Sequence, residues 1–217
     1  MSAHPQAESR GRSPRPPEGG EVALTFDDGP DPLWTPRVLE ALDAAGARAT
    51  FFVIVPRARR AAGLLREMLA RGHEVALHCT EHVRHTETSR ERVVRDTAEG
   101  LAGLRDLGVE PALWRPPWGA LAPWTREVAE GFGLALCLWS ADTHDWRGDP
   151  ARRMLLEVAP ALRPGAVVLM HDGLGPGARR SGCRQTVELV APLVARIRAA
   201  GCEPAPAGEI AAKGRLR

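Results

Sequence analysis

Short apolar runs alternate with longer amphipathic segments along most of this 217-residue chain, which limits the folds open to it. An apolar run of about four to eight residues bounded by glycine or proline is typical of a buried strand. Predicted strands cover residues 21–24, 49–55, 74–78, 111–114, 134–139 and 166–170. Predicted helices cover about 36–45, 58–71, 88–107 and 124–130, a segment starting at 149–150, and 185–200. The alternation predicts a mainly parallel sheet with right-handed crossovers, either a closed barrel or a doubly wound open sheet.

Two of the predicted helices begin with recognisable end signals. Thr35 is expected to cap the first helix, since Pro36 suits the first helical position. The stretch Thr88-Ser89-Arg90-Glu91 has the form of a capping box at the start of a long helix.

Composition narrows the class of protein. The chain is long enough for one domain with a substantial core, and we predict that residues 21–212 form it. A net charge of +2 is too small to suggest nucleic-acid binding, and no apolar run approaches the ~20 residues of a membrane span. We expect the four widely spaced cysteines to be free thiols: Cys79, Cys137, Cys183 and Cys202.

The first residues, Met1 to Gly20, are rich in proline, glycine, serine and arginine and contain no apolar h-region. This composition indicates a disordered tail and not a signal peptide. We therefore expect a cytoplasmic protein, or a secreted one if the start of the gene has been trimmed. The oligomeric state is left open.

Polar residues cluster just after the predicted strands. The clusters are Asp27-Asp28, His78 to His82, Arg115 to Gly119, Asp142 to Trp146 and His171-Asp172. In a barrel, loops at the carboxyl ends of the strands meet on one face, where the active site lies. Asp27 and Asp28 point in roughly opposite directions if the segment is extended, so one could hold a cation while the other handles a proton. The other interpretation of Asp-Gly-Pro is an ordinary turn.

His78 and His82 lie four residues apart and could chelate one ion from a helical turn. Alone, the pair is more often two polar or capping histidines. A carboxylate from another strand end favours the metal site, because two histidines and one aspartate leave zinc positions for water and substrate. We expect His85 either to support a metal ligand without binding the metal itself or to lie on the surface, and we expect surface or loop positions for His73 and His144.

Taken together, the clusters resemble the five ordered motifs of the polysaccharide deacetylase family, also called NodB-homology or carbohydrate esterase family 4. The matching segments are Thr25 to Pro30 (TFDDGP), His78 to His82 (HCTEH), Arg115 to Gly119 (RPPWG), Asp142 to Trp146 (DTHDW) and Leu169 to His171 (LMH). One HxxxH alone is a weak signal, whereas five motifs in order are a strong one. The resemblance implies a distorted, incomplete (β/α) barrel, whose seven or eight strands would include weak ones missed among the six predicted.

The resemblance also implies the residues of a metal centre and its base. Asp28, His78 and His82 would bind one divalent metal ion, most often zinc, with cobalt or another transition metal as alternatives. Asp27 would take a proton from the attacking water, and Arg115 would pair with Asp27 and keep it ionised.

The remaining implied roles concern the other side of the scissile amide. The Trp118 backbone N–H would stabilise the oxyanion, and His171 would protonate the leaving amine while Asp145 orients it. Trp139 and Leu169 would line the pocket for the acetyl methyl group. Without the resemblance, packing would be the preferred interpretation of Arg115, Trp118 and Trp139.

Two positions depart from the family pattern. Cys79 stands where the family has serine or threonine, and a thiol is a weaker hydrogen-bonding group for steadying the loop between the histidines. Trp118 replaces the commoner tyrosine, which matters little if its backbone N–H is what acts.

The expected activity is metal-dependent N-deacetylation of an amino sugar or another small N-acetylated glycoside or metabolite. The missing signal peptide favours a small substrate, and so would a basic lid formed by Arg179, Arg180 and Arg184. Alternatives are deacetylation of polymeric chitin or peptidoglycan, and deformylation or cyclic-amide hydrolysis on the same scaffold. A non-enzymatic alternative is an inactive glycan-binding module, which would not need the full set of acid, base and metal ligands.

Overall fold

The structure, a computed structural model, describes residues 19–216 and contains one sheet in which all recorded strand pairings are parallel. The tail predicted to be disordered lies almost wholly outside the described residues. The strands are β1 (Glu21–Asp27), β2 (Thr50–Ile54), β3 (Glu74–Cys79), β4 (Leu113–Trp114), β5 (Ala135–Leu136), β6 (Ala141–Asp142), β7 (Val167–His171) and β8 (Glu203–Ala205). Their order is β5-β4-β3-β2-β1-β7-β6, and β8 pairs with β1.

This strand order is that of a barrel left open on one side. Five strands follow one another in chain order, and the first strand lies beside β7, as expected when a sheet curls round on itself. No pairing joins β5 to β6 among the described residues, so the curl does not close. The distorted, incomplete (β/α) barrel expected from the sequence is therefore confirmed, and the doubly wound alternative is wrong.

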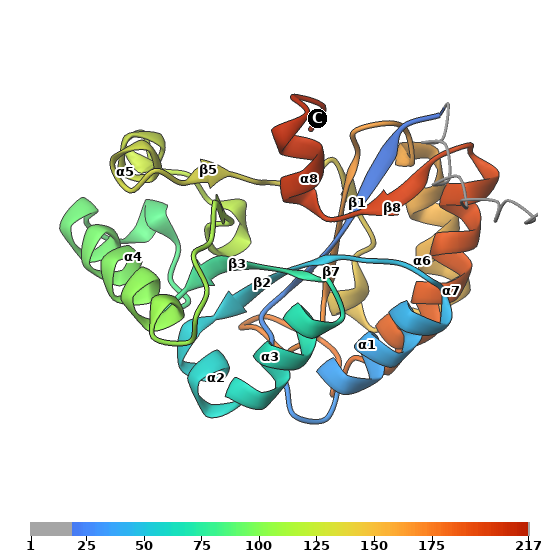
Figure 1. Cartoon of the computed structure of the whole chain (residues 1–217), viewed down its shortest axis with the longest axis horizontal. Coiled ribbons are helices and arrows are strands. Elements are labelled where there is room, and N and C mark those ends of the chain that lie inside the picture. The colour runs from blue at the N-terminus through green and yellow to red at the C-terminus, as the bar shows by residue number, and fades with distance from the viewer. Residues whose placement is uncertain (1–18, 217) are drawn as a thin grey trace, which may run out of the picture.

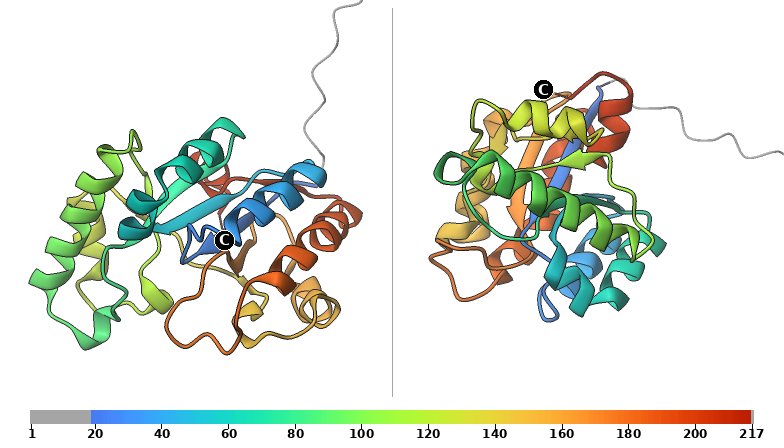
Figure 2. Two further views of the ribbon diagram at one scale, coloured as in Figure 1. Left: turned by 90° about the horizontal axis from the view of Figure 1, so that it is seen from below. Right: turned by 90° about the vertical axis from the view of Figure 1, so that its left-hand side faces the viewer.

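Helices surround the curled sheet (Figures 1 and 2). They are α1 (Thr35–Ala44), α2 (Val55–Arg60), α3 (Ala62–Ala70), α4 (Arg90–Arg105), α5 (Thr125–Gly131), α6 (Ala151–Val158), α7 (Arg184–Ala199) and α8 (Ala207–Ala212). In Figure 1, α1 to α3 lie below the strands, α4 lies at one end of the molecule, and α6 and α7 lie at the other. None of the described helices combines the length and apolarity needed to cross a membrane.

The alternation of side chains along β1 separates two apolar cores. Val22, Leu24 and Phe26 belong to the large core that also includes buried residues of α1, α4, α6 and α7. Ala23 faces the other way, into a smaller core with Phe52, Ala76, Leu113 and Ile210. Because successive strand residues point to opposite faces, Thr25 and Asp27 follow Ala23 into the interior of the curl.

Three details of the helices differ from the sequence predictions. The predicted second helix is two helices, because the backbone breaks at Ala61, where φ is −118° and ψ is 40°. Thr35 does not cap α1; its hydroxyl donates to Asp172 instead, at 2.5 Å. Ser89, not Thr88, is the N-cap of α4, and its hydroxyl accepts from the Arg92 N–H.

The predicted fifth strand, residues 134–139, is the largest difference in the sheet. Ladder pairing covers only β5, and the next strand, β6, begins at Ala141. In between, the carbonyls of Cys137 and Leu138 accept from the Arg115 guanidinium, at 2.8 Å and 3.1 Å, and not from a neighbouring strand. β8 and α8 were not predicted, since the last residues have no clear periodicity.

Candidate active site

The parallel register brings residues from opposite ends of the chain together at one mouth of the curl. Asp27, the last residue of β1, lies directly beside His171, the last residue of β7. Leu169 of β7 lies between Thr25 of β1 and Asp142 of β6. Equivalent positions on neighbouring parallel strands share a face, so these side chains converge regardless of their separation in sequence.

Asp28 turns away from Asp27 because its backbone is left-handed, with φ of 72°. Such a conformation is uncommon for a residue other than glycine and needs support from its surroundings. Arg57 supplies it: its guanidinium donates to the Asp28 carbonyl at 2.7 Å and to the Leu174 carbonyl at 3.0 Å. Gly175 leaves room for the carboxylate, since a Cβ at that position would lie 2.1 Å from Asp28 Oδ2.

Three side chains converge as metal ligands would. Donor atoms of Asp28, His78 and His82 all lie within 4.8 Å of one another. Nε2 of His82 lies 3.2 Å from Asp28 Oδ1, and Nε2 of His78 lies 3.5 Å from it. This Oδ1 atom is buried and has no hydrogen-bond partner among the described residues, which leaves its lone pairs for a cation. The donor set and the unpartnered oxygen fit a divalent metal ion.

Surrounding contacts orient this triad. The His78 Nδ1–H donates to the Arg115 carbonyl at 2.6 Å, which leaves Nε2 facing Asp28. Metal-binding histidines usually have a partner of this kind on the second nitrogen. Burial opposes ionisation of Asp28, but His78 and His82 outweigh burial and hold the pKa of Asp28 well below its usual range. The carboxyl is therefore a carboxylate, the form that binds a cation.

Asp27 faces a fully buried arginine. Arg115 donates to Asp27 Oδ1 at 2.8 Å and to the Thr25 hydroxyl at 2.7 Å. Its guanidinium carbon lies 4.0 Å from the centre of the Phe52 ring. The guanidinium also donates to the carbonyls of Cys137 and Leu138. Contacts on several sides hold it in place, and it in turn holds the Asp27 carboxylate.

His171 and Asp145 form a second charged pair. The His171 Nδ1 lies 2.6 Å from Asp145 Oδ1, and the His171 backbone N–H donates to Asp145 Oδ2 at 2.9 Å. Burial acts to lower the pKa of His171, but the charge and hydrogen bond of Asp145 outweigh it and raise the pKa to about 9. Asp145 is fully buried, which opposes ionisation, yet His171 and then Arg180 bring the pKa of Asp145 down to about 2.

Arg180 is not part of a lid. Its side chain is 3% exposed, and it donates to Asp145 Oδ2 at 3.0 Å and to the His171 carbonyl at 3.1 Å. Thr186 also donates to Asp145 Oδ2, at 2.6 Å. Arg180 thus holds the Asp145–His171 pair from behind, a role the sequence did not suggest because the contact spans 35 positions.

The other two arginines of the predicted lid do not line the cavity. Arg184 is the first residue of α7 and pairs with Glu188 at 2.9 Å in an exposed position. Arg179 lies over the Trp146 ring, with its guanidinium carbon 5.5 Å from the ring centre. The expected three-arginine lid is therefore wrong.

A cavity of about 360 Å³ lies above these groups. Trp118, Trp139, Trp146 and Leu169 supply its apolar walls. Trp118 has a positive φ of 55°, and its ring packs edge-on against the His82 ring at 4.2 Å. The cavity is also lined by Asp142, which belongs to the same sequence motif as Trp146. Arg84 and Arg180 line it too, and neither belongs to a motif.

The loop between the two histidines is steadied by a residue that the sequence did not single out. Asp96 on α4 accepts from the backbone N–H groups of Thr80 and Glu81, and its carbonyl accepts from the Thr80 hydroxyl. Cys79 is buried, and burial raises the pKa of its thiol. The missing hydroxyl at position 79 is thus offset by its neighbour Thr80. All four cysteines are free thiols, as predicted.

The other histidines that the structure describes, His73, His85 and His144, do not line the cavity. His85 is buried against Trp114 and Trp124, and its Nδ1 lies 3.1 Å from the Thr125 hydroxyl. His73 lies in the loop before β3, one of the two positions predicted for it, but it is buried and not on the surface; its Nδ1 accepts from the Ala49 N–H.

Burial lowers the pKa values of His73 and His85 to about 4, which keeps both neutral. His144 lies in the loop after β6, as expected, and is partly buried.

Comparison with known proteins adds the family. The family model described as polysaccharide deacetylase matches residues 15–137. A peptidoglycan-N-acetylglucosamine deacetylase of Bacillus cereus is 35% identical over 83% of both chains. A chitooligosaccharide deacetylase of a Bradyrhizobium species is 37% identical over 85% of this chain and 88% of its own length. The crystal structure of the Bc1960 peptidoglycan N-acetylglucosamine deacetylase superimposes with a TM-score of 0.81 at 26% identity, covering 89% of each chain. The chain therefore belongs to the polysaccharide deacetylase family of metal-dependent hydrolases, which act on amide carbon–nitrogen bonds.

Proposed function

We propose that this protein removes acetyl groups from N-acetylglucosamine units of an oligomeric or polymeric glycan. The observation that carries the proposal is the placement of Asp27 and His171 beside the Asp28–His78–His82 triad, all lining one cavity. Amide hydrolysis needs an activated water, a site for the oxyanion and an acid for a poor leaving group. The cavity offers a candidate for each.

We assign the metal position to the triad and expect zinc. Two histidines and one carboxylate are a common zinc donor set in hydrolases, with positions left for water and substrate. When bound, the metal supplies Lewis acidity, which polarises the acetyl carbonyl and makes water a better nucleophile at neutral pH.

Asp27 and His171 divide the proton transfers between them. Asp27, held by Arg115, accepts a proton from the attacking water. His171 is protonated below pH 9 because of Asp145, and it donates a proton to the departing nitrogen. The products are a free amine on the sugar and acetate. Base and acid stand on neighbouring strands, on either side of the position we assign to the acetamido group.

Trp139 and Leu169 form the wall against which we place the acetyl methyl group. We assign the Trp118 backbone N–H to the oxyanion, since the left-handed turn at Trp118 sets that N–H apart from a regular helix. A small apolar wall favours acetyl over longer acyl groups by about 1–3 kcal/mol per methylene.

The nature of the relatives supports an oligomer or polymer as substrate. Both relatives described above carry names that refer to glycans of several sugars, peptidoglycan and chitooligosaccharide. The basic lid that favoured a small soluble substrate is absent, because Arg180 is buried beneath His171. Location in the cytoplasm stays a prediction.

Acetate release tests this proposal. Zinc-loaded protein is incubated with chitotetraose and with peptidoglycan glycan strands, and metal-free protein serves as the control. Acetate should appear with either glycan and disappear after chelation, and added zinc should restore it. N-formylated glycan and a cyclic amide are tested alongside. Release of formate or ring opening without any acetate would favour the sister reactions, and binding of glycan without any turnover would favour a binding module.

A further inference from the structure

Among the described residues, two arginines line the cavity, and they differ in what their charge does. Arg180 is buried and paired with Asp145. Arg84, two positions after His82, has a side chain that is 40% exposed. Its recorded ion pair is with Glu87, at 3.6 Å and in solvent, where Glu87 is 71% exposed. A pair of this kind contributes little and is readily exchanged.

Stacking fixes the position of Arg84. Its guanidinium carbon lies 4.3 Å from the centre of the Trp118 ring, and Trp118 in turn contacts His82 edge-on. The guanidinium and a proposed metal ligand thus contact the same indole ring. Because a stacked guanidinium keeps its N–H groups in its own plane, they stay free to bind a planar anion in two-point fashion.

Trp146, another lining residue of the cavity, also has arginines beside it. Arg147 and Arg179 lie over the Trp146 ring, with guanidinium carbons at 5.1 Å and 5.5 Å from its centre. The carboxylates of Asp27 and Asp28, by contrast, lie deep in the site and are 4% exposed. Arg84 is therefore a partly exposed cation on the wall of the cavity, whereas the acidic ligands lie deep in it.

We propose that Arg84 binds a carboxylate on the sugar next to the one being deacetylated. The inference rests on the proposed glycan deacetylase activity and names its substrate class: a glycan in which N-acetylglucosamine alternates with an amino sugar that carries a free carboxylate, as in peptidoglycan glycan strands freed of their stem peptides. A chitooligosaccharide has no anionic group and would meet Arg84 with hydroxyls alone. Arg84 is thus a specificity-determining residue, and it takes no part in bond breaking.

Two tetrasaccharides of equal length separate the possibilities. One is chitotetraose, and the other alternates N-acetylglucosamine with N-acetylmuramic acid, whose lactyl ether carries the carboxylate. Acetate release by zinc-loaded protein gives kcat/KM for each glycan. In the Arg84→Gln variant we expect kcat/KM on the carboxylated glycan to fall about tenfold, mainly through KM, because an interaction equal in ground and transition states is lost. On chitotetraose the change should stay within about twofold.

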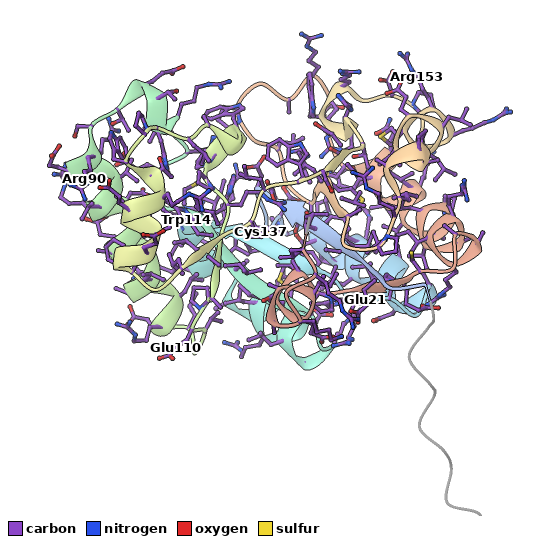
Figure 3. All side chains as sticks on the ribbon, turned by 90° about the horizontal axis from the view of Figure 1, so that it is seen from above. Glu21, Arg90, Glu110, Trp114, Cys137 and Arg153 are labelled. Atoms are coloured by element: carbon purple, nitrogen blue, oxygen red, sulfur yellow. The ribbon has the colours of Figure 1, made fainter. Side chains whose placement is uncertain are left out.

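The matched control is Arg90→Gln. Arg90 is a similarly exposed arginine, 52% exposed, that begins α4 and pairs with Glu127 outside the cavity. Figure 3 shows it at the edge of the molecule. The Arg90→Gln variant should leave kcat/KM on both glycans unchanged. Higher salt should narrow the wild-type preference for the carboxylated glycan and leave the Arg84→Gln variant unaffected.

A binding measurement keeps the inference separate from the proposed activity. Both glycans are titrated into Asp27→Asn protein with and without Arg84→Gln, where no turnover is needed. A Kd for the carboxylated glycan that rises about tenfold supports the inference even if acetate release fails. Equal losses on both glycans would show that Arg84 merely supports Trp118, and no loss on either would show that Arg84 does not contact the substrate; both results overturn the inference.

Discussion

The two ends of the curled sheet are built from the same strands but from opposite kinds of side chain. Toward the amino end the interior is apolar, and Ala23 of β1 belongs to the same inner core as Ile210 of α8. At the carboxyl end the interior holds carboxylates, imidazoles and one guanidinium. Thr50 and Glu74 fasten α8 to the amino end by accepting from the N–H groups of Ala207 and Gly208.

The difference between the two ends separates the residues that stabilise the fold from those that we assign to the reaction. Apolar burial stabilises the fold directly, whereas a buried charge costs free energy unless it is paired. At the carboxyl end Arg115 pairs with Asp27 and Arg180 pairs with Asp145, whereas Asp28 Oδ1 has no partner among the described residues, and we propose the metal for it. We therefore expect changes at one end to alter activity and changes at the other to alter stability.

The largest expected effect is at the metal position. The His82→Ala variant should lose bound zinc and with it acetate release, because two protein ligands cannot hold the ion as three do. Elemental analysis of purified protein measures the zinc, and circular dichroism checks that the fold is kept. Full occupancy in this variant would remove His82 from the ligand set.

Next comes the base. Asp27→Asn keeps the shape of the side chain and its contact with Arg115 but accepts no proton, so kcat should fall by about 10²- to 10⁴-fold. Zinc content should be unchanged. Steady-state acetate release measures the effect, and a variant within about tenfold of wild type would show that another group takes the proton.

At the amino end the expected effect falls on stability. Ile210→Ala should lower the free energy of unfolding by about 2–5 kcal/mol, because it leaves a cavity in the inner core. Its kcat/KM at low temperature should match wild type. Leu156→Ala is the control, since Leu156 is 67% exposed and its loss should cost under about 0.5 kcal/mol. A loss of activity without a loss of stability would break the separation of the two ends.

A smaller effect is expected from Arg57, which holds the left-handed backbone of Asp28. Arg57→Gln should weaken zinc affinity by about 10- to 100-fold, the usual cost of removing a group that orients a ligand. Competition with a zinc chelator measures affinity without turnover. Arg60→Gln, an exposed neighbour on α2, should leave affinity unchanged. Equal affinity in both variants would show that the Asp28 backbone needs no clamp.

The smallest effect is the alkaline limb of the pH profile. The pKa of His171 is raised to about 9, so the proton it donates is present below that pH and is lost as pH rises through it. kcat should therefore fall toward tenfold per unit above about pH 9. Asp145→Asn removes the charge that raises the pKa of His171 and should move the limb to lower pH. A limb that stays in place would assign it to another group.

What could be predicted from the sequence follows local pattern. Apolar runs located β1, β2, β3 and β7, and the motif residues at their ends located Asp27, Asp28, His78, His82 and His171. Residues that act across long separations were missed. Arg180 in its loop resembles any solvated arginine, and its partner Asp145 lies 35 positions away. Asp96 and Arg57 lie on helices whose sequences do not show which loop they face. β4 and β5 lie within the predicted strands 111–114 and 134–139 but have two residues each, and β6, also of two residues, is too short to show a period and was not predicted.

The gap between β5 and β6 gives Arg115 a structural role in addition to its contact with Asp27. In a closed barrel, the backbone N–H groups of a neighbouring strand would donate to the carbonyls of this segment. Here the Arg115 guanidinium donates to the carbonyls of Cys137 and Leu138 and also to the Asp27 carboxylate. The Arg115 side chain thus replaces the hydrogen bonds of a missing strand. The same guanidinium holds the open edge of the barrel and sets the position of the base, Asp27. Lysine carries the same charge but lacks the planar guanidinium. Arg115→Lys would therefore weaken the hydrogen bonds to the segment after β5 and, at the same time, displace the Asp27 carboxylate.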